Sequence, residues 1–251
     1  MCVFNRSVEK AAAWVQEFGN DSATTPALAA AGCDFVFVCV GNDDDVRSVV
    51  LGEHGALAGM KPGAILVDHT TASAELAREL GAATEAASVG FLDAPVSGGQ
   101  AGAEGGVLTV MVGGGEAVYA QAEPVMDAYA RFSKLLGPSG SGQLAKMVNQ
   151  ICIAGIVEAL AEGLNFANRA GLDGAALIET LSNGAAGSWP IENLHHTILS
   201  FDYYFFFAVV VRTITLLNSI TLYYLVCLLL LSHPSFLSLL SSLLLFSSFP
   251  F

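Results

Sequence analysis

Short apolar runs alternate with stretches of helical periodicity through the first half of this 251-residue chain, and this alternation constrains the fold most. The clearest run, residues 34–40 (DFVFVCV), is typical of a strand buried on both faces. Strands that alternate with helices build a parallel sheet covered by those helices. We therefore expect strands at 2–4, 34–40, 64–67, 91–94 and 108–112, and helices at 7–16, 26–31, 42–51, 73–80 and 116–129, with Ser7 and Asn42 as helix caps.

The pattern changes after Gly142. Residues 143–170 contain no proline and carry apolar residues at helical spacing, which predicts one long helix. Asp173 is placed to cap a further helix that runs through Leu181. A sheet domain is therefore expected to lead into an all-helical domain, with the boundary near 137–142.

The last fifth of the chain differs in kind. Beyond residue 202 the one charged residue is Arg212, and residues 213–232 form an uncharged, leucine-rich run long enough to span a bilayer. Three explanations fit this change: a membrane anchor, a low-complexity tail, or the translation of a non-coding segment. We favour the last and treat residues 201–251 as an aberrant hydrophobic tail.

Charge and cysteine usage exclude several classes of protein. The formal net charge is −13, and no basic stripe offers a surface to nucleic acid, although a local cationic site would suffice for a small anion. The five cysteines form no CxxC pair and are odd in number, which favours a reducing compartment over a disulfide framework.

No apolar segment of a signal peptide follows Met1. His69, His195 and His196 lack metal-ligand spacing, so we expect no metal and assign them no role.

The first chemical motif spans residues 93–106 (DAPVSGGQAGAEGG). It follows an expected strand, and open α/β sheets bind ligands at the carboxyl ends of their strands. Ser97 offers a hydroxyl, while Gly98 and Gly99 expose backbone N–H groups that a carboxylate could approach closely. An ordinary glycine-rich turn is the alternative explanation.

The second motif spans residues 137–149 (GPSGSGQLAKMVN), where glycines lead into the long helix. Lys146 and Asn149 are spaced i and i+3, so they share a helix face. A lysine among apolar residues is desolvated, which lowers its pKa toward the range useful for proton transfer. The alternative is a lysine that extends from a solvated helix face into water.

The third motif is Asn5-Arg6, directly after the first expected strand. In a dinucleotide-binding sheet, the residue at the end of the second strand contacts the adenosine ribose, and an arginine there accommodates the 2′-phosphate of NADP. An ordinary surface arginine explains Arg6 equally well when no other motif is considered.

Taken in this order and spacing, the motifs resemble those of the β-hydroxyacid dehydrogenases, the group that includes 3-hydroxyisobutyrate dehydrogenase. The resemblance runs from about residue 1 to 198 and includes Val67-Asp68-His69-Thr70-Thr71 and residues 184–189. It implies the fold class α/β, with a Rossmann-type parallel sheet followed by a long interdomain helix and an all-helical domain. Residues 1–137 would form the dinucleotide-binding domain and residues 138–200 a partial helical domain.

The resemblance also implies roles for individual residues. Lys146 would be the general acid or base at the substrate oxygen. Ser97, Gly98 and Gly99 would hold the substrate carboxylate, with Asn149 orienting the substrate. The cofactor, NADP with NAD as the alternative, would be bound by Asn5, Arg6, Val40, Gly41 and Thr70. The substrate would be a small hydroxy acid or semialdehyde, the compartment cytoplasmic or an organellar matrix, and assembly as a homo-oligomer is compatible with the family.

Two departures from the family pattern affect these expectations. The family begins with a strand and a GxGxxG turn, and about 25 residues of that βαβ unit, which is roughly 30 residues long, are missing here, so we expect an incomplete sheet and weakened cofactor binding. The match fades near Asp202, where the family continues with charged helices. A non-catalytic or membrane-tethered protein is the alternative that these departures leave open.

Overall fold

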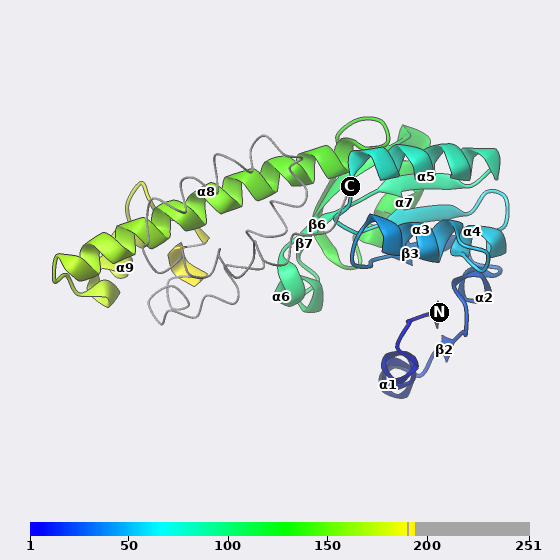
Figure 1. Ribbon diagram of the computed structural model, residues 1–251, viewed down its shortest axis with the longest axis horizontal. Helices are drawn as coiled ribbons and strands as arrows, with labels where there is room; N and C mark the ends of the chain where they lie inside the picture. The colour runs from blue at the N-terminus through cyan, green and yellow to red at the C-terminus, as the bar shows by residue number, and fades with distance from the viewer. Residues whose placement is uncertain (190, 194–251) are drawn as a thin grey trace, which may run out of the picture. The chain divides into compact units, whose positions relative to one another are not determined.

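The computed structural model describes residues 1–189 and 191–193 (Figure 1). The predictions made for the tail at 201–251, including the apolar run at 213–232, lie outside these residues. The described chain divides into two compact units, Met1–Val148 and a second unit that begins at Asn149. Each unit is described by itself.

The first unit is an α/β structure built on a six-stranded sheet, in the order β3-β4-β5-β7-β6 with β8 beside β7. The α/β class is confirmed, but the sheet is mixed. β3 (Phe35–Val38), β4 (Ile65–Asp68) and β5 (Gly90–Asp93) are parallel, whereas β7 (Leu108–Gly114) runs antiparallel to β5 and to β6 (Val96–Ser97). The chain reverses here because the glycine-rich segment after Asp93 contains β6 and the short helix α6 (Gly99–Glu104).

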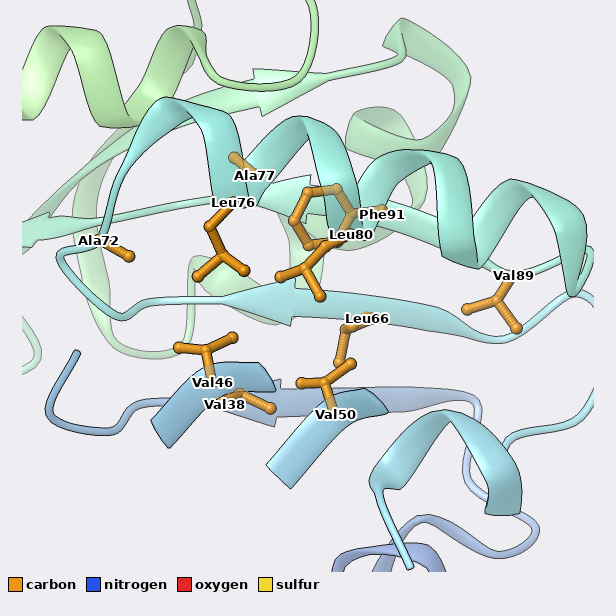
Figure 2. Close-up of a cluster of buried hydrophobic side chains, with 10 residues drawn as sticks. All are labelled: Val38, Val46, Val50, Leu66, Ala72, Leu76, Ala77, Leu80, Val89 and Phe91. Atoms are coloured by element: carbon orange, nitrogen blue, oxygen red, sulfur yellow. The ribbon is translucent and has the colours of Figure 1, made fainter. Parts of the chain in front are cut away.

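Alternate residues of the strands enter two separate cores. Leu66 and Phe91 pack with residues of α3 (Asp43–Leu51) and α5 (Ala74–Ala86), as Figure 2 shows. Val67 and Leu92 face the other way, toward α7 (Glu116–Met126). Since successive side chains of a strand point to opposite faces, β4 and β5 are buried on both sides, and this burial fixes their register.

Strand β3 is less buried than its apolar sequence predicts. Phe37 is 40% exposed, and Phe35 and Val36 are half-buried. Within the described part of the chain β3 pairs with β4 alone, so it lies at the edge of the sheet. The prediction of a strand buried on both faces is therefore wrong, because a continuous apolar run does not distinguish a central strand from an edge strand.

Helix boundaries follow local chemistry. Asn42 caps α3 through the Asp45 N–H at 2.9 Å, as predicted. Ser7 precedes α1 (Val8–Phe18), but its hydroxyl donates to Glu9 and does not cap the helix. The helix predicted to reach residue 129 ends at Met126, and a strand that we did not predict follows, β8 (Ala130–Leu135).

The remaining elements of the first unit are β1 (Cys2–Val3) and β2 (Asp21–Ser22), which pair in a separate parallel sheet, and the helices α2 (Pro26–Ala30) and α4 (Ala56–Gly59).

The predicted long helix is α8 (Ser141–Arg169), a single helix of 29 residues. It is followed by α9 (Gly174–Ser182), which Asp173 caps through two backbone N–H groups. The second unit buries a small core that contains Leu160, Leu164, Ile178 and Ile191. By length and composition, α8 is also the one helix among the described residues that could cross a membrane, which is weak evidence because core helices of soluble proteins pass the same test.

Candidate active site

Several of the residues predicted to bind cofactor and substrate, among them Val40, Gly41 and Thr70, follow neighbouring strands of the sheet. In the parallel register Val38 pairs with Asp68, and Asp68 pairs with Asp93. Val40, Thr70 and Pro95 therefore leave the same edge of the sheet. This edge, at the carboxyl ends of parallel strands, is where open α/β sheets bind ligands.

Thr70 joins two of the residues predicted to line the cofactor. Its side chain is buried, and its Oγ1 accepts a hydrogen bond from the Val40 N–H at 3.0 Å. Gly41, the next residue after Val40, is exposed. A Cβ at Gly41 would lie 2.5 Å from Oδ2 of Asp45, the end of a partly exposed side chain, so the backbone at Gly41 lies close to the first turn of α3.

The first turn of α8 is bonded to the carboxyl end of β5. Asp93 is fully buried, and its two carboxylate oxygens accept from the N–H groups of Gly140 at 2.8 Å and Gln143 at 2.9 Å. Burial raises the pKa of Asp93, and the hydrogen bonds from Gly140 and Gln143 act in the opposite direction. The N–H groups at the start of a helix have no acceptor within that helix, so Asp93 acts as a capping residue for α8.

A second attachment runs through the side chain of Gln143. Its Oε1 accepts from the Ala72 N–H at 3.0 Å, and its Nε2 donates to the Thr70 carbonyl at 2.8 Å. Thr70 therefore contacts Val40 through its hydroxyl and α8 through its carbonyl. Gln143 was not predicted from the sequence as a site residue. The one signal that could have indicated it is its position at the start of the long helix, directly after the glycine-rich segment 137–142.

Lys146 lies almost one turn beyond Gln143 on α8 and is 9% exposed. This burial agrees with the expectation that the lysine is largely removed from water, and its proposed role stays a prediction. Asn149, which is half-buried, follows on the same helix, where its Nδ2 donates to Oε1 of Gln150 at 2.9 Å. It is also the first residue of the second unit.

The predicted carboxylate-binding residues lie in the chain reversal after β5. Ser97 ends β6 and is half-buried, and Gly98 and Gly99 are exposed. Their φ angles are 133° and 62°, in the left-handed region that a side chain disfavours. The glycine pair is thus required by the turn itself, and it also leaves the backbone open to solvent.

Asn5 and Arg6 are exposed and stand apart from the contacts around Thr70. Oδ1 of Asn5 accepts from the Ser7 N–H at 2.9 Å. Arg6 is paired with Asp45, with 3.6 Å between Nη1 and Oδ1, and 91% of its side chain is exposed. Asp45 belongs to the first turn of α3, so the pair places Arg6 near the segment that follows Gly41.

His69 has a role in the structure that the sequence did not predict. Its Nδ1 lies 2.6 Å from the Ala94 carbonyl and its Nε2 lies 2.8 Å from the Tyr129 hydroxyl. Phe37 stacks on the ring, with 5.8 Å between centroids. Burial lowers the pKa of His69, raises the pKa of Tyr129, and raises the pKa of the neighbouring Asp68 to about 6. Among the described residues, no cluster of three histidine, cysteine or carboxylate side chains could hold a metal ion.

Two family models match the chain. Residues 1–150 match the NAD binding domain of 6-phosphogluconate dehydrogenase. Residues 140–213 match the NAD-binding domain of NADP-dependent 3-hydroxyisobutyrate dehydrogenase. The two matches overlap at the first turns of α8.

Curated relatives extend the likeness over most of the chain. An uncharacterized oxidoreductase of Shewanella frigidimarina is 60% identical over 207 residues, which are 82% of this chain and 71% of that protein. The probable mitochondrial 3-hydroxyisobutyrate dehydrogenase-like 1 of Arabidopsis thaliana is 40% identical over 202 residues, which are 80% of this chain and 60% of that protein. The chain thus spans between about three fifths and seven tenths of the length of these relatives.

Solved structures agree with the sequence matches. The 3-hydroxyisobutyrate dehydrogenase of Salmonella typhimurium superposes with a TM-score of 0.70 at 31% identity, and covers 80% of this chain and 70% of that one. Psf3 in complex with NADP⁺ and 2-OPP superposes with a TM-score of 0.74 at 25% identity, over the same shares of the two chains.

The fold and the strand-end site define a Rossmann-type α/β protein. Within that class, the matched models and relatives show that the chain belongs to the β-hydroxyacid dehydrogenase family.

Proposed function

We propose that the protein is a nicotinamide-dependent oxidoreductase of the 3-hydroxyisobutyrate dehydrogenase type, which acts on a small β-hydroxy acid or the matching semialdehyde. The observation that carries this proposal is the placement of Lys146. Lys146 is buried on α8. The first turn of this helix is bonded to Asp93 and Thr70, at the strand edge where the cofactor is expected. The named activities of the relatives support the same chemistry.

The strand-end residues fit a nicotinamide cofactor. Val40, Gly41 and Thr70 leave the ligand-binding edge together, and Gly41 keeps its backbone free of a side chain. Arg6 would contribute a cation toward the adenosine end, with NADP favoured and NAD as the alternative. When bound, the nicotinamide would exchange hydride with the carbon that carries the substrate oxygen.

The chain's own residues would carry out the remaining tasks. Ser97 and the backbone N–H groups of Gly98 and Gly99 would hold the substrate carboxylate. Lys146 would donate a proton to the carbonyl oxygen during reduction, and would accept it from the hydroxyl during oxidation. Asn149 would orient the substrate from the same helix. We propose a cytoplasmic or organellar-matrix setting.

Loss of the lysine tests the assignment. Because cofactor binding is expected to be weakened, the purified full chain is assayed at NADPH concentrations high enough to saturate it. We expect it to oxidise NADPH in the presence of a small semialdehyde, and Lys146→Ala to lower kcat by roughly 10² or more, as removal of a positioned acid–base group does. Lys134→Ala is the matched control, because Lys134 is an exposed lysine of β8. Undiminished turnover in Lys146→Ala would refute the catalytic role, and absence of turnover in the wild type with every semialdehyde tried would refute the function.

Cofactor choice is tested separately at Arg6. If Arg6 receives the 2′-phosphate, Arg6→Ala should weaken NADPH binding by about tenfold, the value of one charge-assisted contact, and leave NADH binding unchanged. Fluorescence titration with both cofactors measures this difference. Equal weakening of both would remove Arg6 from the cofactor assignment.

A further inference from the structure

A buried glutamine joins the strand edge to the helix that carries Lys146. Gln143 is 1% exposed, and both ends of its side-chain amide are bonded to the backbone of the segment that follows β4. Oε1 accepts from Ala72 and Nε2 donates to Thr70. Because a buried donor or acceptor without a partner costs free energy, an amide satisfied at both ends has a fixed orientation.

The backbone of the same residue is held independently. Its N–H donates to Asp93 at 2.9 Å, and Gly140 donates to the other carboxylate oxygen at 2.8 Å. The first turn of α8 is thus bonded to the end of β5 through its backbone, and to the segment after β4 through the Gln143 side chain. Two attachments to different strands prevent rotation of this turn, which one attachment would permit.

We propose that Gln143 is a positioning residue, which fixes Lys146 relative to Thr70 and so relative to the cofactor that Thr70 lines. This proposal rests on the proposed function. Lys146 follows Gln143 by three positions, so the two side chains lie on neighbouring turns of one helix face. A rotation at Gln143 would move the lysine amine with it, and a misplacement of about 1 Å can reduce turnover by about 10²-fold.

Two substitutions separate the contacts of the amide. Gln143→Met keeps the length of the side chain and removes both hydrogen bonds. Gln143→Glu keeps the acceptor for Ala72 but places an oxygen opposite the Thr70 carbonyl. The matched control is Gln121→Met, because Gln121 is an exposed glutamine on α7 whose side-chain amide donates to the Ala117 carbonyl. Each variant is compared well below its own unfolding midpoint, and Gln143→Glu carries the comparison if Gln143→Met does not fold.

A double-mutant cycle with Lys146 distinguishes positioning from general damage. We expect Gln143→Met to lower kcat by roughly tenfold or more in the wild-type background. In the Lys146→Ala background it should lower the residual kcat by less than about twofold, because the group on which it acts is gone. Equal losses in both backgrounds, or an unchanged kcat in the folded variant, would overturn the proposal.

A second measurement does not depend on activity. Acetic anhydride labels lysine amines according to their accessibility and charge state, and mass spectrometry gives the extent for each lysine. We expect labelling of Lys146 to rise severalfold in Gln143→Met relative to the exposed Lys61 and Lys134, and to stay unchanged in Gln121→Met. If the wild type has no turnover but this rise occurs, the proposed function fails and the positioning of Lys146 by Gln143 stands. Unchanged labelling in Gln143→Met would overturn the positioning itself.

Discussion

The imidazole of His69 links the end of β4 to the carbonyl of Ala94, 25 positions later in the chain, with 2.6 Å between Nδ1 and the oxygen. Because a carbonyl can only accept, Nδ1 carries the proton. In the neutral ring Nε2 then accepts from the Tyr129 hydroxyl, at 2.8 Å. The tautomer is therefore set by the segment that leads from Asp93 toward Ser97 and Gly98.

This geometry predicts different outcomes for two amide substitutions at His69. The amide nitrogen of His69→Asn can occupy the position of Nδ1 and keep the bond to Ala94, whereas that of His69→Gln reaches the position of Nε2. His69→Gln loses the bond to Ala94, which holds the segment that leads to Ser97 and Gly98, the residues proposed to bind the substrate carboxylate. We therefore expect the KM for the substrate to rise about fivefold or more in His69→Gln and to stay near the wild-type value in His69→Asn. Steady-state kinetics at saturating cofactor measure both, and equal KM values in the two variants would contradict a role for the Ala94 bond.

The burial of His69 also predicts how stability depends on pH. Its pKa in the folded protein is lowered from 6.5, so the unfolded chain binds the proton more readily. The stability that the neutral ring contributes is present above pH 6.5 and is lost as the pH falls through the folded pKa. Urea unfolding at a series of pH values should show this loss in the wild type and a smaller loss in His69→Asn. An identical acid-side slope in both proteins would argue against it.

Asp68, the preceding residue, should act in the opposite direction. Burial raises its pKa from 3.8 to about 6, so the folded protein holds the proton more tightly than the unfolded chain. The contribution of Asp68 to stability is then fully present below pH 3.8 and is lost as the pH rises through about 6. Moving the pKa from 3.8 to about 6 corresponds to about 3 kcal/mol, so Asp68→Asn should be more stable than the wild type at neutral pH by up to about that amount. The unfolding free energy at pH 7 measures this, and a variant less stable than the wild type would contradict it.

Two glycines of α8 should respond oppositely to alanine. A Cβ at Gly142 would meet the carbonyl oxygens of Met111 and Asp93, whereas a Cβ at Gly155 would meet no atom of the described residues within 4 Å. We expect Gly142→Ala to destabilise the protein by about 3 kcal/mol or more, because backbone atoms must move. Gly155→Ala should stabilise the helix by about 0.5–1 kcal/mol. Thermal unfolding compares the two, and similar midpoints would show that the first turn of α8 yields easily.

The elements that sequence reasoning located well are those specified by local chemistry. The burial of Val67 and Leu92, the cap at Asn42 and the uninterrupted helix through Lys146 each follow from residues close together in the chain. Strand β8 was missed because charged and polar residues interrupt its apolar pattern, as expected of a half-exposed strand. The edge position of Phe37 was missed because strand order is not encoded in the composition of one strand.

The contacts that assemble the candidate site could not be predicted in the same way. The bonds that Gly140 donates to Asp93 and Gln143 donates to Thr70 join residues 47 and 73 positions apart. Nothing in the local pattern around Gln143 specifies its partner, because the contact arises from the three-dimensional return of the chain. The sequence therefore indicated which motif carries the chemistry at Lys146, but not how that motif is held.

The same long-range bonds determine when this site can form. A growing chain that has reached β5 already contains Thr70, Ala72 and Asp93, yet the groups that satisfy them belong to residues 140–143. Contacts with such large sequence separation form slowly, because the intervening chain must first be ordered. We therefore expect the candidate site to form late in folding. Until α8 docks, we expect the Asp93 carboxylate to stay hydrated and the Thr70 carbonyl and the Ala72 N–H to lack their partners from Gln143.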